Sequence, residues 1–206
     1  MKKLVLAIVM MASATVSFAQ HEVGSINIQP KVSFNVSSFD KLENRFDNKY
    51  KSGFAAGVEC EYRMTKTFAL SVGAFYSQKG LDAKVKEDMI LSNGTNIKGS
   101  KVSCSLDYID VPILANFYVW KGLALKVGVQ PAFKVREKYE MGSNEVKPKD
   151  DKVKAFDICV PLGISYDFGR LSVELRSSPG FIKLNSNKDY TNVCGQLMVG
   201  YKFSLK

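Results

Sequence analysis

The stretch Leu106–Arg136 alternates apolar and polar residues over two long runs, and it constrains the fold more than any other part of the sequence. The two runs are joined at Lys121-Gly122, and the odd-numbered residues of 109–119 and of 123–135 form their apolar sets. Successive side chains of a strand point to opposite faces, so each run has one oily face and one small, polar or charged face. The pattern predicts an antiparallel hairpin but leaves open which face meets water.

The first residues of the chain predict an export signal. Lys2 and Lys3 precede an apolar run over residues 4–16, and Ser17-Phe18-Ala19 then offers the small residues that a signal peptidase reads. The run is too short for a membrane-spanning helix. We therefore expect a signal peptide, helical in the precursor, at residues 1–19, and one mature domain at residues 20–206.

Six further segments of the mature chain alternate with period two, which makes eight predicted strands together with the hairpin. Tight connections are expected around Thr65-Lys66, Lys121-Gly122 and Gly169-Arg170. The other connections, at residues 37–52, 80–103, 137–153 and 182–189, are longer and polar. Short turns at one end and long loops at the other predict an all-β fold, an eight-stranded antiparallel up-and-down barrel.

The faces of the predicted strands indicate a transmembrane β-barrel, because charged residues gather on the inward face and apolar residues on the outward face. The expected lumen charge network consists of Glu59, Glu61, Arg63, Asp110, Lys126, Lys134, Arg136, Glu174 and Arg176. Aromatic residues lie toward the two ends of the outward sets, as the belts of a membrane barrel do. These lipid-facing belts are predicted to comprise Phe34, Phe54, Tyr62, Phe68, Tyr76, Phe117, Phe133, Phe156, Tyr166, Phe168, Tyr201 and Phe203.

Two short segments resemble a known family. Residues 108–118, Tyr-Ile-Asp-Val-Pro-Ile-Leu-Ala-Asn-Phe-Tyr, and the last strand, ending at Val199-Gly-Tyr-Lys-Phe203, resemble the PorT-like outer-membrane β-barrel domain family of Gram-negative bacteria. The resemblance covers the whole mature chain and implies a barrel in the outer membrane. It also implies, by analogy, a link to protein secretion.

Other site chemistries find little support in the sequence. Cys60, Cys104, Cys159 and Cys194 show no disulfide-framework spacing, and we expect free, packed thiols. No metal site or cofactor is predicted, since His21 is the one histidine and no CxxC occurs. We expect no enzyme activity, because the single histidine, His21, lies at the mature N-terminus, at the predicted periplasmic end, and Asp150-Asp151 are the loop candidates for catalysis by carboxylates alone. The formal net charge of +9 is spread along the chain, so no nucleic-acid surface is indicated.

The expected function is that of a structural or interaction scaffold with a filled lumen and extracellular loops. A narrow porin or small-solute channel is the alternative, and a soluble lipocalin-like periplasmic binding barrel is the second. Expected partners are outer-membrane lipid and lipopolysaccharide, the barrel assembly machinery, and a protein bound through loops 80–103 and 137–153. We expect a monomer in the outer membrane with both mature termini in the periplasm. Loop lysines, namely Lys79, Lys84, Lys86, Lys98 and Lys101, are candidates to meet lipopolysaccharide headgroups.

Overall fold

A computed structural model describes residues 23–40, 46–85, 101–141, 144–145, 155–180 and 191–205. Its strands are β1 (Ile26–Asp40), β2 (Phe46–Lys49), β3 (Lys51–Arg63), β4 (Phe68–Val85), β5 (Lys101–Asp110), β6 (Ile113–Trp120), β7 (Leu123–Met141), β8 (Asn144–Glu145), β9 (Phe156–Cys159), β10 (Leu162–Phe168), β11 (Leu171–Pro179), β12 (Thr191–Tyr201) and β13 (Phe203–Leu205). No helix in these ranges is long and apolar enough to cross a membrane.

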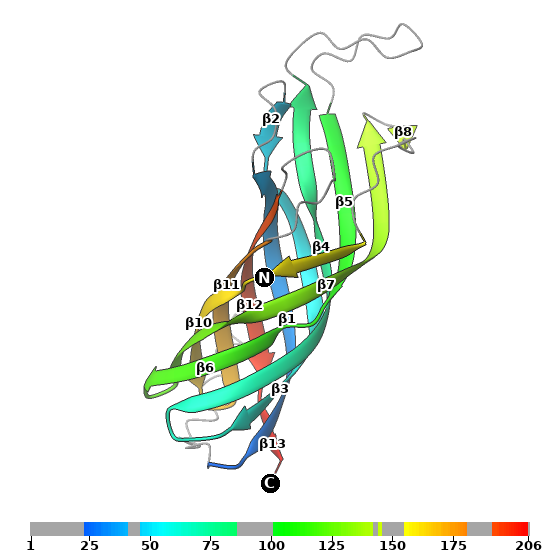
Figure 1. Cartoon of the computed structure of the whole chain (residues 1–206). Coiled ribbons are helices and arrows are strands. Elements are labelled where there is room, and N and C mark those ends of the chain that lie inside the picture. Colours follow the sequence, from blue (N-terminus) through cyan, green and yellow to red (C-terminus); the bar gives the residue numbers. More distant parts are fainter. Residues whose placement is uncertain are drawn as a thin grey trace, which may run out of the picture.

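The strands close into a single ring with eight positions (Figure 1). The order around the ring is β1, β3, β4, β5/β6, β7, β9/β10, β11 and β12, where a slash joins two strands that share one position. Antiparallel pairing of β12 with β1 closes the ring, and β13 continues β12 along β1. The predicted eight-stranded antiparallel barrel is confirmed.

Two ring positions are shared by two segments because a proline interrupts the strand. Pro112 separates β5 from β6, and Pro161 separates β9 from β10. Proline has no backbone N–H to donate to a neighbouring strand. Its carbonyl still accepts: Gly73 N donates to Pro112 O at 2.9 Å, and Gly128 N donates to Pro161 O at 3.3 Å. Each interruption therefore leaves the wall continuous.

The three predicted tight turns lie at one end of the barrel, between β3 and β4, β6 and β7, and β10 and β11. Gly122 and Gly169 have φ angles of 83° and 63°, in a region that residues with a Cβ rarely adopt. Glycine at these positions lets a two-residue connection reverse the chain without strain.

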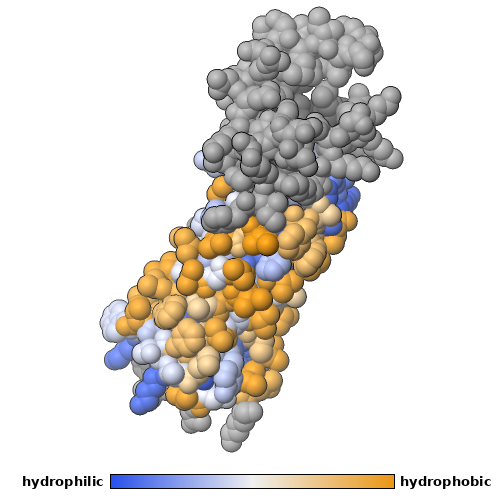
Figure 2. All heavy atoms as spheres, in the orientation of Figure 1, coloured by the Kyte–Doolittle hydropathy of each residue, from blue (hydrophilic) through white to orange (hydrophobic). Residues whose placement is uncertain are grey.

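The outer wall of the barrel is apolar, and the interior is polar. Leu125, Val129 and Leu197 expose 47, 47 and 51% of their surface outward. Figure 2 shows such side chains covering much of the wall on one face. Apolar exposure of this extent is foreign to the surface of a soluble monomer, whereas a lipid-facing barrel wall requires it. The soluble lipocalin-like alternative needs the reverse arrangement, which the structure does not have.

β4, β5 and β7 form an extension at the end opposite the tight turns, where β2 pairs with the end of β4 and β8 pairs with the end of β7 (Figure 1). In this extension the polarity is reversed, because the inward residues form an apolar cluster: Leu81, Ala83, Cys104, Leu106, Tyr108 and Ala132, with Tyr139 packed against them. The outward neighbours Gln78, Asp82 and Ser105 are polar and partly or fully exposed. The extension is thus built like a sheet that stands in water.

A bulge in β7 marks the beginning of this extension. Tyr108 pairs with Lys134 and Asp107 pairs with Arg136, so one residue, Val135, is extra on β7. An extra residue shifts the alternation of all side chains that follow it. Beyond the bulge, the odd-numbered residues of β7 face inward, and the even-numbered ones face outward.

The predicted long loops were drawn too wide. β4 and β5 together take residues 80–85 and 101–103 of the expected 80–103 loop, and β7 extends to Met141. Most of the expected 37–52 loop is strand as well, in β1, β2 and β3. Residues 86–100 and 146–154, including Asp150 and Asp151, lie outside the described residues. The predicted signal peptide at 1–19 lies outside them too.

Candidate functional site

The middle of the lumen holds a cluster of five charged side chains. Lys31 Nζ lies 2.7 Å from Glu59 Oε1 and 2.9 Å from Glu174 Oε2. Lys126 Nζ lies 3.0 Å from each of the same two oxygens. Arg176 Nη2 lies 3.1 Å from Glu59 Oε2 and 2.5 Å from Glu174 Oε1. We call these five residues the central cluster.

The central cluster crosses the whole lumen. Its members come from β1, β3, β7 and β11, and the Lys126–Glu59 contact joins β7 to β3, which are three ring positions apart. Each of the five side chains is at most 2% exposed. An eight-stranded barrel is just wide enough for side chains to fill it. The cluster therefore packs across the lumen at the middle of the barrel.

A second group lies on the tight-turn side of the central cluster. Glu61 accepts hydrogen bonds from Tyr118 Oη at 2.8 Å and from Asn116 Nδ2 at 3.0 Å. Lys202 Nζ lies 2.6 Å from Asp167 Oδ2 and donates to Tyr118 Oη at 3.1 Å. The Arg63 guanidinium carbon lies 3.6 Å from the centre of the Tyr118 ring. Tyr118 thus connects both carboxylates to both cations of this group.

A third group lies on the long-loop side. Lys79 Nζ forms a 2.8 Å ion pair with Asp110 Oδ1 and lies 5.1 Å from the centre of the Tyr108 ring. Nearby, Asn35 donates to Ser77 Oγ at 3.2 Å and accepts from Gln196 Nε2 at 3.1 Å. These hydrogen bonds cross-link β1, β4 and β12 above the central cluster.

Charge is balanced among the buried lumen residues that the structure describes. Six cations, Lys31, Arg63, Lys79, Lys126, Arg176 and Lys202, face six carboxylates, Glu59, Glu61, Asp110, Asp157, Asp167 and Glu174. The difference is zero, as expected where an unpaired buried charge costs several kcal/mol. No group of three or more His, Cys, Asp or Glu that fits a metal ion occurs in the described ranges.

The predicted lumen network is placed inside the barrel with one exception. Glu59, Glu61, Arg63, Asp110, Lys126, Glu174 and Arg176 are buried, and Lys134 is half-buried beside Glu137 on the same strand. Arg136 lies on the outer face and is exposed, so its predicted place in the lumen is wrong. The physical cause is the bulge at Val135, which turns the next residue outward.

Several lumen residues were absent from the predicted site. Lys79 had been assigned to a loop, yet it faces the lumen, because β4 extends to Val85. The alternation of Leu81 and Ala83 beyond it was the signal for this longer strand. Tyr118 and Asn116 stand on the polar face of the predicted hairpin, but only their strand partners reveal that they contact Glu61.

All the predicted belt aromatics lie on the outer wall, fully or partly exposed. Ten of the twelve contact one another in five pairs, across or along strands. At the long-loop end, Phe34 and Phe54 have ring centres 5.7 Å apart, and Phe133 and Phe156 have centres 5.3 Å apart. At the tight-turn end, Phe68 and Phe117 are 5.2 Å apart. Such paired rings suit the headgroup level at each side of a membrane.

All four cysteines are free thiols in the structure, as the sequence predicted. Cys104, Cys159 and Cys194 are buried on the inner side, and Cys60 is partly buried on the wall. They lie on four different ring positions, since Cys60 is on β3, Cys104 on β5, Cys159 on β9 and Cys194 on β12.

A closed ring with an apolar wall and a charged, packed lumen defines an outer-membrane β-barrel protein. A family model described as the outer membrane protein β-barrel domain matches residues 18–186, and the chain belongs to this family. No protein of the curated set matches the chain.

Solved outer-membrane proteins resemble the chain at low sequence identity. Neisserial surface protein A is 14% identical over 86% of this chain and 97% of its own, with a TM-score of 0.52. Ail of Yersinia pestis is 12% identical over 88% of this chain and 100% of its own, with a TM-score of 0.48. OprG of Pseudomonas aeruginosa is 13% identical over 89% of this chain and 97% of its own, also at 0.48. The likeness to the neisserial protein supports the fold and nothing finer.

Proposed function

We propose that the protein is a non-conducting outer-membrane scaffold that presents the extended end of its barrel to partners outside the cell. The central cluster carries this proposal, because its five buried charged side chains pair with one another across the lumen and link β3 to β7 through Glu59 and Lys126. The proposal includes no catalysis, because the buried charged side chains of the central cluster form ion pairs with one another.

The proposed orientation follows from the two ends of the barrel. The tight turns and the C-terminal strand β13 lie at one end and face the periplasm in this proposal, as short turns of outer-membrane barrels do. The signal peptide at 1–19 and assembly by the barrel assembly machinery are parts of the same proposal. So is a monomeric state.

The partner surface in this proposal is the extension of β4, β5 and β7 together with the connections beyond it. Its apolar inner cluster around Leu106 gives the extension a core of its own, so it offers a rigid, polar outer surface. The resemblance of residues 108–118 and 199–203 to PorT-like barrels supports a role in secretion or surface assembly. That link rests on resemblance alone.

A narrow pore is the second candidate, and one observation favours it. The side-chain amides of Asn27 and Gln29, buried on the tight-turn side of the central cluster, have no hydrogen-bond partner within the described part of the chain. Buried amides of this kind are usually hydrated. Water on that side of the cluster would form one part of a pore, and the central cluster would be the narrow point along it.

Conductance in planar bilayers separates the two functions. The scaffold predicts that the purified chain inserts without producing current steps above background. Replacing the central carboxylates, as Glu59→Ala with Glu174→Ala, removes the groups that hold the plug, and steps are then expected if the double variant folds. Regular steps from the unaltered chain would establish the pore instead.

A further inference from the structure

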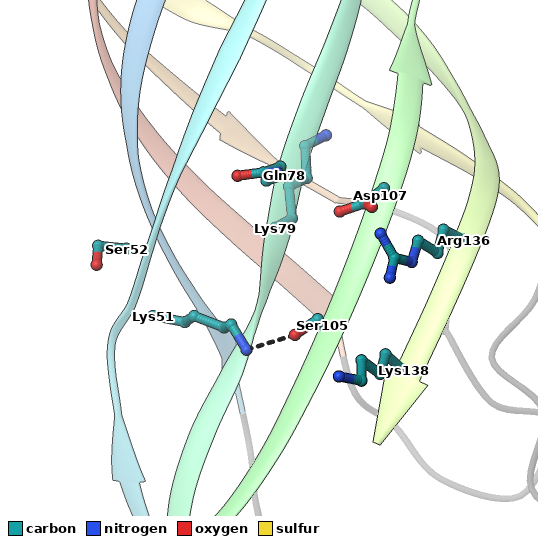
Figure 3. Close-up of a pocket in the computed structure, with 8 residues that line it drawn as sticks. All are labelled: Lys51, Ser52, Gln78, Lys79, Ser105, Asp107, Arg136 and Lys138. Carbon is teal, nitrogen blue, oxygen red and sulfur yellow. Dashed lines mark hydrogen bonds between the residues drawn. The ribbon is translucent and has the colours of Figure 1, made fainter. Parts of the chain in front are cut away.

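A pocket of about 190 Å³ opens on the outer face of the extension, away from the lumen (Figure 3). Its lining residues come from β3, β4, β5 and β7: Lys51, Ser52, Gln78, Lys79, Ser105, Asp107, Arg136 and Lys138. Ser52, Gln78 and Arg136 are exposed. Lys79 contributes only its near part, because its ammonium group pairs with Asp110 inside the barrel.

Two of the cations reach this pocket because of the bulge in β7. If Val135 took a regular place in the ladder and β7 had no bulge, strict alternation would turn Arg136 and Lys138 toward the lumen. With it, they stand on the outer face, and Glu137 and Tyr139 point inward. Figure 3 shows the side chains of Arg136 and Lys138 on the same side of β7. Bulges commonly re-aim side chains in this way next to functional sites.

The third cation reaches the pocket across a glycine. Lys51 begins β3, and its side chain crosses β4 to donate to Ser105 Oγ at 2.7 Å and Ser103 Oγ at 2.6 Å on β5. It passes over Gly80, where an added Cβ would lie 3.0 Å from Lys51 Cδ and 2.0 Å from Cys104 O. Gly80 also has a φ of 149°, which a residue with a Cβ rarely adopts.

The pocket lies beside the aromatic belt at the long-loop end. The Tyr76 hydroxyl, from that belt, donates to Asp107 Oδ2 at 2.6 Å on the pocket floor. Val135, 55% exposed, separates the belt residue Phe133 from Arg136 along β7. Belt rings sit at the level of lipid headgroups. The pocket therefore opens at the headgroups of the adjoining leaflet.

Positive charge predominates in the pocket. Lys51, Arg136 and Lys138 supply three positive charges against the one carboxylate of Asp107, a net of +2. Counting Asp82, which lies 3.6 Å from Lys51 Nζ, the net is still +1. Arg136 forms no hydrogen bond or ion pair in the described part of the chain, so its guanidinium fork is free to bind an oxyanion through two parallel bonds.

We propose that this pocket binds the phosphate of a phosphorylated glycolipid in the outer leaflet. Arg136 and Lys138 contact the phosphate oxygens, the hydroxyl of Ser105 adds a polar contact from β5, and the acyl chains lie along the apolar wall below Val135. The exposed position favours a lipid over a soluble anion, because a lipid already stands beside the wall. The site is independent of whether the lumen conducts.

Native mass spectrometry of the full chain in detergent tests the site. The probes are lipid A with both phosphates, the same lipid after enzymatic dephosphorylation, and inorganic phosphate. The phosphorylated lipid is expected to bind one to one, and dephosphorylation is expected to weaken binding roughly tenfold or more, as loss of charge-assisted hydrogen bonds does. This comparison needs no variant. Equal binding of the two lipids would overturn the proposal.

A matched pair of variants locates the binding. Arg136→Gln with Lys138→Gln removes an arginine and a lysine from the pocket, and binding is expected to fall roughly tenfold. Lys121→Gln with Arg170→Gln removes the same two residue types from exposed tight turns, and binding is expected to stay unchanged. Heat-modifiable gel migration verifies that both variants fold. Equal loss in both, or displacement of the lipid by low-millimolar inorganic phosphate, would contradict a lipid-phosphate site.

Discussion

Lys31 donates a 2.7 Å hydrogen bond to Glu59 from the neighbouring strand, and neither side chain is more than 1% exposed. The pair belongs to a cluster of three cations and two carboxylates, so its charge is already +1. Removing one carboxylate leaves +2 among side chains that are at most 2% exposed. The stability of the barrel therefore depends strongly on each of these side chains.

Glu59→Gln is expected to destabilise the folded barrel by about 3–5 kcal/mol, the usual cost of breaking a buried pair by removing one partner. Urea unfolding in detergent, followed by tryptophan fluorescence, measures the change. Adding Lys31→Gln returns the cluster to +1, and part of the loss is expected to be recovered. A double variant less stable than the single one would show that packing, not charge, dominates here.

An arginine on the lipid-facing wall is expected to cost more at mid-membrane than at its edge. Val127→Arg, midway along the apolar part of β7, should destabilise the barrel by about 2–4 kcal/mol, and Val135→Arg, beyond the belt residue Phe133, by about 0–1 kcal/mol. Both positions point outward, with 38 and 55% exposure. Refolding yields into lipid vesicles measure the difference. Similar costs would mean that Val127 and Val135 do not differ in depth in the membrane as proposed.

The bulge makes a prediction about three successive residues of β7. Single cysteines at Arg136 and Lys138 are expected to react quickly with a bulky, membrane-impermeant maleimide, and one at Glu137 slowly, because Glu137 points inward. The background chain has its native cysteines replaced by serine. Fast labelling at Glu137 with slow labelling at its neighbours would show that β7 alternates regularly and has no bulge at Val135.

The Cys104 thiol lies beyond the aromatic belt at the long-loop end, and Cys104 pairs with Leu81 in the extension. Burial raises its pKa to about 11. At pH 8 only about one thiol in a thousand is then ionised, and the thiolate is the reactive form. Alkylation by iodoacetamide should be slow at pH 8 and accelerate roughly tenfold per pH unit up to pH 10. Ser105→Cys, on the outer face, is the control, and an equally slow reaction there would remove burial as the cause.

Much of the barrel was predictable because alternation is a local signal. The apolar sets of the strands, the glycines at the tight turns and the charges among small residues all depend on neighbours in the sequence. Seven of the nine expected network residues are buried in the lumen for this reason. The pairing of those charges was not predictable, since Glu59 and Glu174 meet only through the register of the closed ring.

Two errors have separate physical causes. Arg136 was assigned by counting alternate residues through Val135, but a bulge has no distinct residue type that reveals it in a single sequence. The ends of β4 and β5 were missed because polar residues there meet water on the outer face, which resembles a loop in composition. The inward alternation of Leu81, Ala83, Cys104 and Leu106 was the weaker but correct signal.

The reversal of polarity along β4, β5 and β7 sets the depth at which the molecule sits in the membrane. Between Asp110 and Leu106 the inner surface changes from charged to oily, and the outer surface changes from oily to charged at the same height. Sliding the barrel outward would lift the apolar wall into water, and sliding it inward would drag Arg136 and Lys138 into hydrocarbon. The strands themselves thus mark the boundary between the part of the wall that faces lipid and the part that faces water. The bulge at Val135 contributes to this boundary, because it turns Arg136 and Lys138 outward.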